Sequence, residues 1–339
     1  MTHIILSLHK IRSMKHLSII VPTGEFILPS IIGPYMMFNT VNGYLAQQGK
    51  EPAFQIDLVG LTKEENLYGN AFAVRPTKQL SEIKKTDLII VGTIDGDLQD
   101  SLRKNQPFVT WIKKMREENN CEVASLCMGA FLLAQTGLLD GKTCTTHWMG
   151  QDHFENMYEQ IQLQPDRVIT EDDGIYSSGG AFSYLNLIVY LIEKHCGKEV
   201  AIWISKIMEI DYSRESQSQF QIFQGQREHQ DVSIIKAQDF IESNFHEKIS
   251  VEELADLSAI GRRSFVRRFK KATANTPLEY IQRVKIEAAK KRFESSKDSI
   301  NEVMYSVGYN DNKSFRKVFR KFTGITPSDY KLRYSRLMN

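Results

Sequence analysis

The chain of 339 residues is 42% hydrophobic, which is enough for two domains that each bury a core. Four cysteines without short regular spacing argue against a disulfide scaffold or a zinc knuckle and favour a reducing cytoplasm. The net charge of +2 hides an asymmetry, because residues 231–339 hold 22 Lys+Arg and 14 Asp+Glu, whereas the preceding residues hold 21 and 27. A basic C-terminal part indicates a polyanionic partner for that part alone.

Residues 1–15 are interpreted as an N-terminal extension. Their short apolar runs are interrupted by basic residues and are too short for a secretory signal. No run in the chain approaches the roughly 20 apolar residues of a membrane helix. We therefore expect a cytoplasmic protein with no membrane partner.

Short apolar runs alternate with helical patterns over residues 16–210. Strands are predicted at 17–22, 54–60, 87–92 and 121–126, and helices at 30–48, 108–119, 128–137, 179–197 and 198–209. The strands are continuous in Val, Ile and Leu, which is typical of a parallel sheet covered on both faces. This region is thus predicted to be a doubly wound, flavodoxin-like α/β domain that binds ligands at the carboxyl ends of its strands.

The stretch Ala-Ser-Leu-Cys-Met-Gly-Ala-Phe, residues 124–131, has the order of a strand, a sharp turn and a helix start. A cysteine in such a turn can be held exposed and acidified by the unpaired N–H groups of the helix. Cys127 is therefore a candidate nucleophile.

Residues 211–230 are rich in Ser, Gln and charge, with few apolar residues and no clear period, which predicts a linker. From Asp231 onward the helical patterns end at clear stop signals, and no strand pattern remains. Residues 231–339 are predicted to be an all-α domain.

A repeat lies within this helical part. The segment that starts at Ser264 matches the one that starts at Ser314, at an offset of 50 residues. The matched pairs are Ser264/Ser314, Phe265/Phe315, Phe269/Phe319, Thr273/Thr323, Thr276/Thr326, Pro277/Pro327 and Tyr280/Tyr330. Each copy follows a short helix and a tight turn, so the sequence predicts two helix-turn-helix motifs.

Each basic helix of the repeat has an apolar face and a cationic face. The helical period places these cations opposite the phenylalanines: Arg263, Arg267 and Lys270 in the first copy, and Lys313, Arg316, Lys317 and Arg320 in the second. Such side chains neutralise phosphates, and arginine also reads guanine in the major groove. The alternative, a merely solvated charged face, is disfavoured by the duplication.

An uninterrupted helix is predicted between the repeats, from Pro277 to about Glu294. At about 1.5 Å per residue it is roughly 27 Å long, which suits two recognition helices about one DNA turn, about 34 Å, apart. One chain is then expected to occupy two successive major grooves.

Residues 231–339 resemble the AraC/XylS family of transcription regulators, most specifically through SVGYNDNKSFRKVFRKFTGITPSDYK. The resemblance implies double-stranded promoter DNA and RNA polymerase as partners. The base-facing positions that it implies are Arg263, Val266 and Arg267 in the first recognition helix and Asn312, Lys313, Arg316 and Lys317 in the second. Tyr305 stands where this family usually has a small residue, so we expect local repacking around it.

Residues 16–210 resemble the DJ-1/PfpI branch of the class I glutamine-amidotransferase-like proteins, through SLCMGAFLLAQTGLLDGKTCTTHW at 125–148. Cys127 is at the elbow, and His147 follows twenty residues later. Active members of this branch usually pair the cysteine with an acid, whose position Ser30 occupies here. Glu25 is nearby but several residues out of register, so proton transfer for turnover is poorly supported.

Three interpretations of this domain stay open. The first is a non-catalytic pocket for a small-molecule effector, lined by Ser30, Cys127, Met128, His147 and Trp148. The second is a structural domain that mainly dimerises. The third is a hydrolase or glyoxalase with Cys127 as nucleophile, His147 as base and Glu25 as acid. A glutaminase is disfavoured, because "HFE" at 153–155 comes too soon after Cys127 for the His-x-Glu dyad of that activity.

We interpret the chain as a sequence-specific DNA-binding transcription regulator, not an enzyme, which senses a small molecule and forms a homodimer. No cofactor or metal is expected, because His147 and His153 would need a third ligand to hold a metal ion. Cys144 and Cys196 are predicted to be buried thiols on a strand and at a helix end.

Overall fold

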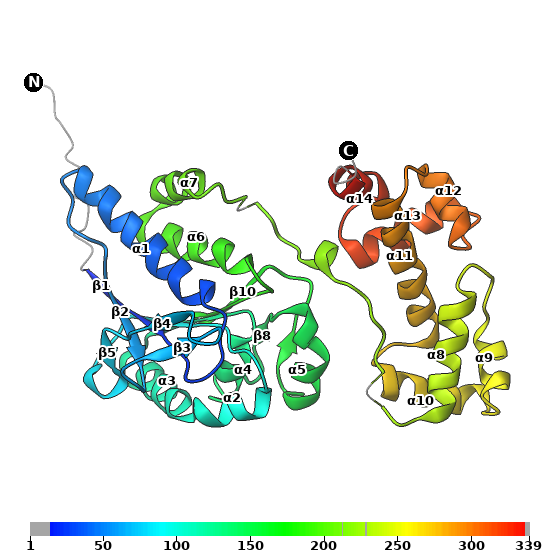
Figure 1. Ribbon diagram of the computed structural model, residues 1–339, viewed down its shortest axis with the longest axis horizontal. Coiled ribbons are helices and arrows are strands. Elements are labelled where there is room, and N and C mark those ends of the chain that lie inside the picture. Colours follow the sequence, from blue (N-terminus) through cyan, green and yellow to red (C-terminus); the bar gives the residue numbers. More distant parts are fainter. Residues whose placement is uncertain (1–13, 212, 228, 336–339) are drawn as a thin grey trace, which may run out of the picture. The chain divides into compact units, whose positions relative to one another are not determined.

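The computed structural model describes residues 14–335 except 212 and 228, so the predicted N-terminal extension, 1–15, lies almost wholly outside the described residues. Contacts divide the chain into two units, Met1–Gln217 and Ser218–Asn339 (Figure 1). The division falls within the segment 211–230 that the sequence suggested as a linker.

A mostly parallel sheet forms the centre of the first unit. Within the described residues it has the order β10-β11-β7-β6-β1-β2-β5. The bounds are β1 Lys15–Ile20, β2 Phe54–Gly60, β5 Lys78–Gln79, β6 Leu88–Val91, β7 Glu122–Leu126, β10 Ile169–Asp172 and β11 Ile175–Ser178. Among the strand pairs of this sheet that the structure describes, only β10–β11 is antiparallel. The predicted α/β fold is confirmed, and the short strands β5, β10 and β11 are additions that the sequence analysis did not predict.

Helices cover both faces of this sheet (Figure 1). One hydrophobic core contains side chains of α1, α6 and α7, and the other contains side chains of α3, α4 and α5. The helix bounds are α1 Pro29–Gln47, α2 Leu98–Lys104, α3 Gln106–Asn119, α4 Gly129–Ala134, α5 Gln151–Met157, α6 Ser183–Cys196 and α7 Lys198–Ile207. Two predictions were too long, because α4 ends at Ala134 and residues 179–182 form a loop before α6.

Shorter elements complete the first unit. The hairpin strands are β3 Glu65–Leu67 and β4 Phe72–Val74, a second small pair is β8 Thr143–Cys144 and β9 Gln162–Leu163, and 3₁₀ turns occupy η1 Leu80–Glu82 and η2 Trp148–Gly150. Cys144 is buried on β8, as predicted, whereas Cys196 at the end of α6 is half-buried.

The regular secondary structure in the described residues of the second unit is all helical. The bounds are η3 Ser218–Phe220, α8 Val232–Asn244, α9 Val251–Leu257, α10 Arg262–Thr273, α11 Pro277–Ser295, α12 Ile300–Ser306, α13 Asn312–Thr323 and α14 Pro327–Tyr334. Two small cores form around Phe265 and Phe269 in the first half and Phe315 and Phe319 in the second, and α11 contributes to both. The all-helical prediction is confirmed.

Several matched positions of the repeat have the same structural role in both halves. Thr276 and Thr326 cap the N-termini of α11 and α14, each followed by a proline in the first turn. The hydroxyls of Thr273 and Thr323 donate to backbone carbonyls one turn earlier, at 2.9 and 2.8 Å. Tyr305 is 61% exposed on α12, so the expected repacking around it is wrong.

Candidate DNA interface and elbow site

The recognition helix of the first half, α10, separates apolar from cationic side chains. Phe265 and Phe269 are fully buried, whereas Arg263, Arg267 and Lys270 are exposed. Val266 is half-buried beside them. Because the phenylalanines fix the rotation of the helix, the three cations lie on its solvent face, as the sequence predicted.

The recognition helix of the second half, α13, also separates apolar from cationic side chains, and side-chain hydrogen bonds stabilise its first turn. The exposed cations on it include Lys313, Arg316, Lys317 and Arg320. The Asp311 side chain caps the helix by accepting the N–H of Ser314 at 2.7 Å. Asn312 donates its amide to the Asn301 side chain at 2.9 Å and accepts a hydrogen bond from the Arg316 guanidinium. Arg316 is therefore oriented before any ligand is present.

Other cations of this unit stabilise the fold. Arg268 on α10 makes a two-pronged contact with Asp231, with N–O distances of 2.9 and 2.7 Å. The Lys285 ammonium is buried, and it donates to the carbonyls of Glu247 at 3.0 Å and Gly308 at 3.3 Å. Lys285 thus connects the loop after α8 to the turn before α13. Charge alone in the sequence does not separate these residues from the solvent-facing ones.

The helix α11 sets the separation of the two halves. Its 19 residues, Pro277–Ser295, correspond to about 28 Å at about 1.5 Å per residue. Buried side chains along it belong to the core of the first half at Tyr280 and of the second half at Phe293. A single rigid element therefore positions both recognition helices.

The elbow follows β7, where Cys127 has a left-handed backbone with φ of 54°. Its N–H donates to the carbonyl of Ser178 at 3.1 Å, and α4 begins two residues later. A Cβ at Gly129 would lie 2.5 Å from the carbonyl oxygen of Gly92, so only glycine fits this approach of α4 to the loop after β6. The sharp strand-turn-helix geometry predicted from the sequence is present.

The thiol at the elbow is not the exposed, acidified group that the motif suggested. Cys127 is 6% exposed, and burial raises the pKa of its thiol. Hydrogen bonds from the Ala181 and Met128 backbones oppose that shift only partly. The group is consequently a protonated thiol at neutral pH and a poor nucleophile.

The position of the expected acid has a structural role. Ser30 donates its hydroxyl to the carbonyl of Ile27 at 2.7 Å and accepts the N–H of Thr93 at 2.9 Å. Glu25 is exposed, and its carboxylate lies beside Gly96. The charge of the Asp95 carboxylate adds to burial in raising the pKa of the Cys127 thiol.

His147 lies on the other wall of the elbow. Its Nδ1 accepts the N–H of Met149 at 3.0 Å, and its ring lies so close to Gly180 that a Cβ there would be 2.5 Å from Cδ2. Burial lowers the pKa of His147, so the imidazole is neutral at pH 7. Trp148 stacks obliquely beside it, with ring centroids 5.3 Å apart.

Two further residues bring these segments together, and the sequence analysis missed both. Thr146 donates its hydroxyl to the carbonyl of Cys127 at 3.0 Å. Gln217 is buried and accepts the N–H of Gly180 at 2.8 Å. The Gln217 side chain lay in a polar segment that resembled a linker, so composition concealed it.

Residues 153–155 belong to the helix α5. Within the part of the chain that the structure describes, no cluster of three or more His, Cys, Asp or Glu side chains is arranged to hold a metal ion. No described helix is long and apolar enough to cross a membrane.

Comparison with known proteins agrees with this division. A helix-turn-helix domain model matches residues 254–333, and a DJ-1/PfpI family model matches residues 39–194. An HTH-type transcriptional regulator of Pseudoalteromonas carrageenovora is 33% identical over 131 residues, which are 39% of this chain and 75% of that protein. The chain belongs to the AraC-type helix-turn-helix regulators. It is a DNA-binding transcription regulator with a DJ-1/PfpI domain.

Similarity to one regulator extends over both domains. The HTH-type transcriptional regulator GbdR of Pseudomonas aeruginosa is 23% identical over 313 residues, covering 89% of this regulator and 79% of GbdR. The crystal structure of a protein from Vibrio parahaemolyticus, described as a transcriptional regulator, has a TM-score of 0.52 and 22% identity. It covers 57% of this chain and 99% of that one, and it shows the fold alone.

Proposed function

We propose that this regulator binds promoter sites through the solvent faces of α10 and α13 together, and that it acts on RNA polymerase bound there. The observation that carries the proposal is the duplicated cationic face on two helices joined by one rigid helix. The base-reading set consists of Arg263, Val266, Arg267, Asn312, Lys313, Arg316 and Lys317. Lys270 and Arg320 contact phosphates at the rim.

The DJ-1/PfpI domain is proposed to be a non-catalytic sensor for a small molecule in the cytoplasm. The effector binds around the elbow, at Ser30, Cys127, Met128, His147 and Trp148. The protonated thiol and the engagement of Ser30 in backbone contacts support binding without turnover. The retained left-handed elbow favours one alternative, a cysteine-dependent hydrolase or glyoxalase with a DNA-binding domain.

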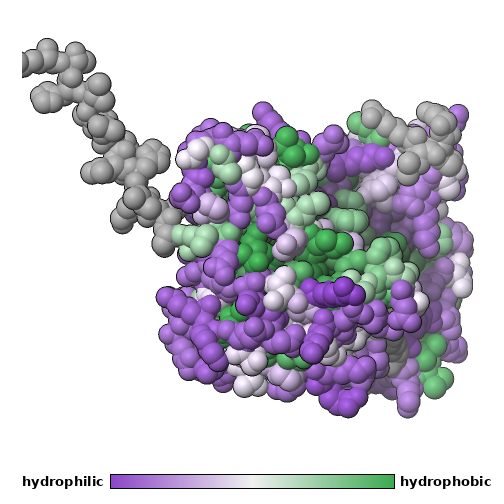
Figure 2. Space-filling model, turned by 60° about the vertical axis from the view of Figure 1, so that its left-hand side comes forward, coloured by the Kyte–Doolittle hydropathy of each residue, from purple (hydrophilic) through white to green (hydrophobic). Residues whose placement is uncertain are grey.

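A second copy of the chain is the proposed partner of an apolar surface on α1. Ile32 and Met36 are 48% and 53% exposed there, and Phe182 is 62% exposed. Gly33 of α1 and Phe182 both lie against the buried Tyr184, which places Phe182 near this part of α1. Figure 2 shows hydrophobic side chains gathered amid hydrophilic ones on one face of the molecule. An identical face on a second copy is self-complementary about a two-fold axis.

The dimer is tested by sedimentation of the full chain. We expect Ile32→Glu with Met36→Glu to convert dimers to monomers, whereas Val232→Glu, at a 79% exposed position in the other unit, leaves the dimer intact. Equal masses for both variants would remove this surface as the interface.

The DNA-binding proposal is tested by genome-wide capture of bound DNA from cells with the wild-type chain and with Arg267→Ala plus Lys317→Ala. We expect discrete sites for the wild type and none for the variant. If the variant keeps the sites, the recognition surface is assigned wrongly. Turnover of a candidate effector that disappears in Cys127→Ala would favour the enzyme alternative.

A further inference from the structure

Residues 218–227, here called the strap, lie against both halves of the helical unit. At one end, Gln219 accepts a hydrogen bond from Arg333 of α14 at 2.7 Å. At the other end, the carbonyl of Gln226 accepts from Gln238 of α8 at 2.9 Å. The strap therefore has polar contacts with the second half and the first half in turn.

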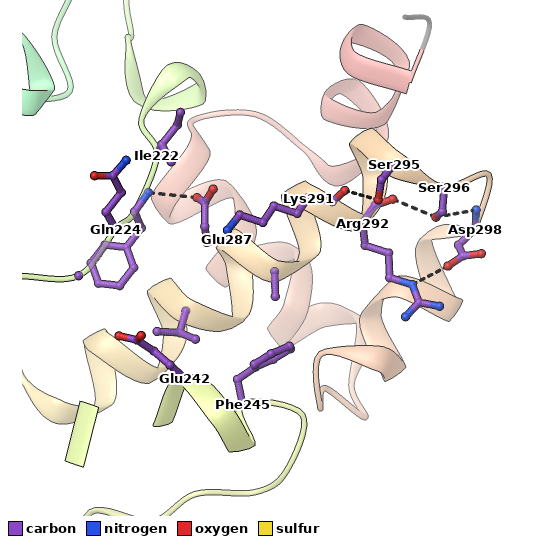
Figure 3. A pocket seen from close by; sticks show the side chains of 14 residues that line it. Ile222, Gln224, Glu242, Phe245, Glu287, Lys291, Arg292, Ser295, Ser296 and Asp298 are labelled. Atoms are coloured by element: carbon purple, nitrogen blue, oxygen red, sulfur yellow. Dashed lines mark hydrogen bonds and ion pairs between the residues drawn. The ribbon is translucent and has the colours of Figure 1, made fainter. Parts of the chain in front are cut away.

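The middle of the strap borders an open groove of about 980 Å³ (Figure 3). Figure 3 shows Ile222 and Gln224 on the strap, opposite Glu287 of α11. The Phe223 N–H donates to the Glu287 carboxylate at 3.2 Å, and the carbonyl of Gln221 accepts from Lys290. The Phe223 ring packs edge-on against Tyr280 of the first-half core, with ring centroids 5.1 Å apart, so a shift of the strap acts directly on the core beneath α10.

The residue that precedes the strap is fixed in the other unit. Gln217 is 2% exposed, and its Nε2 donates to the carbonyls of Pro165 at 2.8 Å, Thr146 at 3.0 Å and Arg167 at 3.2 Å. Its Oε1 accepts the N–H of Gly180 at 2.8 Å. A Cβ at Gly179 would lie 2.5 Å from this side chain, so the glycine loop fits closely around it.

These partners of Gln217 are the walls of the elbow. Thr146 also donates its hydroxyl to the Cys127 carbonyl, and Gly180 lies beneath the His147 ring. The next loop residue, Ala181, provides a backbone hydrogen bond to the Cys127 thiol. One side chain thus contacts both segments that surround Cys127, and the following peptide bond leads into the strap.

We infer that Gln217 is the positioning residue that couples the elbow to the strap and so to the recognition helices. This inference rests on the proposed sensor function. An effector that displaces His147 or the loop at Gly180 changes the hydrogen bonds of the Gln217 side chain. The backbone of Gln217 then shifts, and Ser218, the next residue, moves with it. The coupling is reciprocal, so DNA binding favours one arrangement of the elbow.

The test uses the full-length protein and an operator fragment from the capture experiment. Gly180→Ala places a methyl group against the His147 ring and stands in for an effector. We expect it to change the operator Kd at least about fivefold, the lower end of typical coupling between sites. Gln217→Met keeps the side-chain volume and removes the hydrogen bonds, so Gly180→Ala should then change the Kd less than about twofold. Gln224→Ala, an exposed strap variant, is the matched control and keeps the full response.

A second variant and a second measurement guard against misfolding. Insertion of Gly-Ser-Gly-Ser between Gln217 and Ser218 leaves both sets of contacts and should abolish the response. Hydrogen exchange of residues 218–227 needs no DNA, and Gly180→Ala should accelerate it only when Gln217 is present. Equal effects of Gly180→Ala with and without Gln217, or no effect on exchange in either, would overturn the coupling. If the wild-type protein binds no operator, but Gly180→Ala still accelerates hydrogen exchange of the strap only when Gln217 is present, the proposed function is overturned and the coupling is not.

Discussion

At the elbow and at each recognition helix, a tight turn leads into a helix. The candidate functional side chains are buried at the elbow and exposed on the recognition helices. Cys127 is buried with its thiol protonated, and Ser30 and His147 bind neighbouring backbone groups. Arg267 and Lys317 extend from α10 and α13 into solvent. The comparison shows that an elbow can keep its strand-turn-helix backbone without a reactive thiol. The side chains of Ser30 and His147 hydrogen-bond to the backbone and so stabilise the fold.

Two glycine variants give the largest expected effects and separate the two regions. At Gly308, before α13, φ is +74° and a Cβ would lie 2.4 Å from the His246 carbonyl oxygen, so Gly308→Ala should destabilise the helical unit by about 2–4 kcal/mol. Urea unfolding measures this. Operator affinity should fall as well, because the turn positions α13. In Gly129→Ala at the elbow, the added methyl group would lie 2.5 Å from the Gly92 carbonyl oxygen, so this variant should instead destabilise the first unit. A neutral Gly308→Ala would mean that this turn does not hold the recognition helix.

Removal of a base-reading side chain has the next largest effect. Arg267→Ala should weaken operator binding by about 1–3 kcal/mol and relax discrimination at one base pair. Fluorescence anisotropy with the operator and single-base variants measures both. Arg268→Ala removes the same charge from the same helix on the side that pairs with Asp231, so it should leave base discrimination unchanged. Identical effects of the two variants would show that only overall charge matters.

The reactivity of the Cys127 thiol tests whether the elbow is as inert as its burial indicates. Burial raises the pKa of Cys127 above its ordinary value of 9.0, so iodoacetamide should label it more slowly than the half-buried Cys196 in the native protein. Peptide mass spectrometry reads both sites in one sample. Preferential labelling of Cys127 at pH 7.5 would restore it as a candidate nucleophile.

The smallest expected effect is a pH dependence from His147. Burial lowers the pKa of His147 below 6.5, so the unfolded chain binds the proton first as the pH falls. The contribution of neutral His147 to the free energy of unfolding is complete above pH 6.5. It is lost as the pH falls from 6.5 to the lower pKa of His147 in the folded protein. Asparagine keeps an acceptor for the Met149 N–H but does not titrate, so the advantage of the wild type over His147→Asn in urea unfolding should shrink from pH 8 to pH 5. A constant difference would contradict a lowered pKa of the half-buried His147 imidazole.

The sequence predicted the architecture well because the apolar patterns were strong. The continuous runs at 54–60 and 121–126 correspond to β2 and β7, and the repeat of Phe265 and Phe315 located both recognition helices. The motif at Cys127 located the elbow as a sharp turn, and the structure adds its left-handed backbone. Burial of the thiol depends on long-range packing, which no local pattern contains.

Residues that act through distant partners could not be predicted. Gln217 lies 37 residues from its partner Gly180, within a polar segment that resembled a linker. Lys285 resembles any other lysine of a basic helix, although it is buried between carbonyls of two halves. The antiparallel strand β10 is too short and polar to stand out.

The central claim is that one chain reads two successive major grooves with α10 and α13 held apart by α11. Operator fragments with about five base pairs inserted between the two half-sites test it most directly, since half a turn of DNA moves one half-site to the opposite face. The account predicts that affinity falls to that of an isolated half-site and that Lys317→Ala then has little additional effect if α10 remains bound. Unchanged affinity after the insertion would contradict a rigid pair of recognition helices.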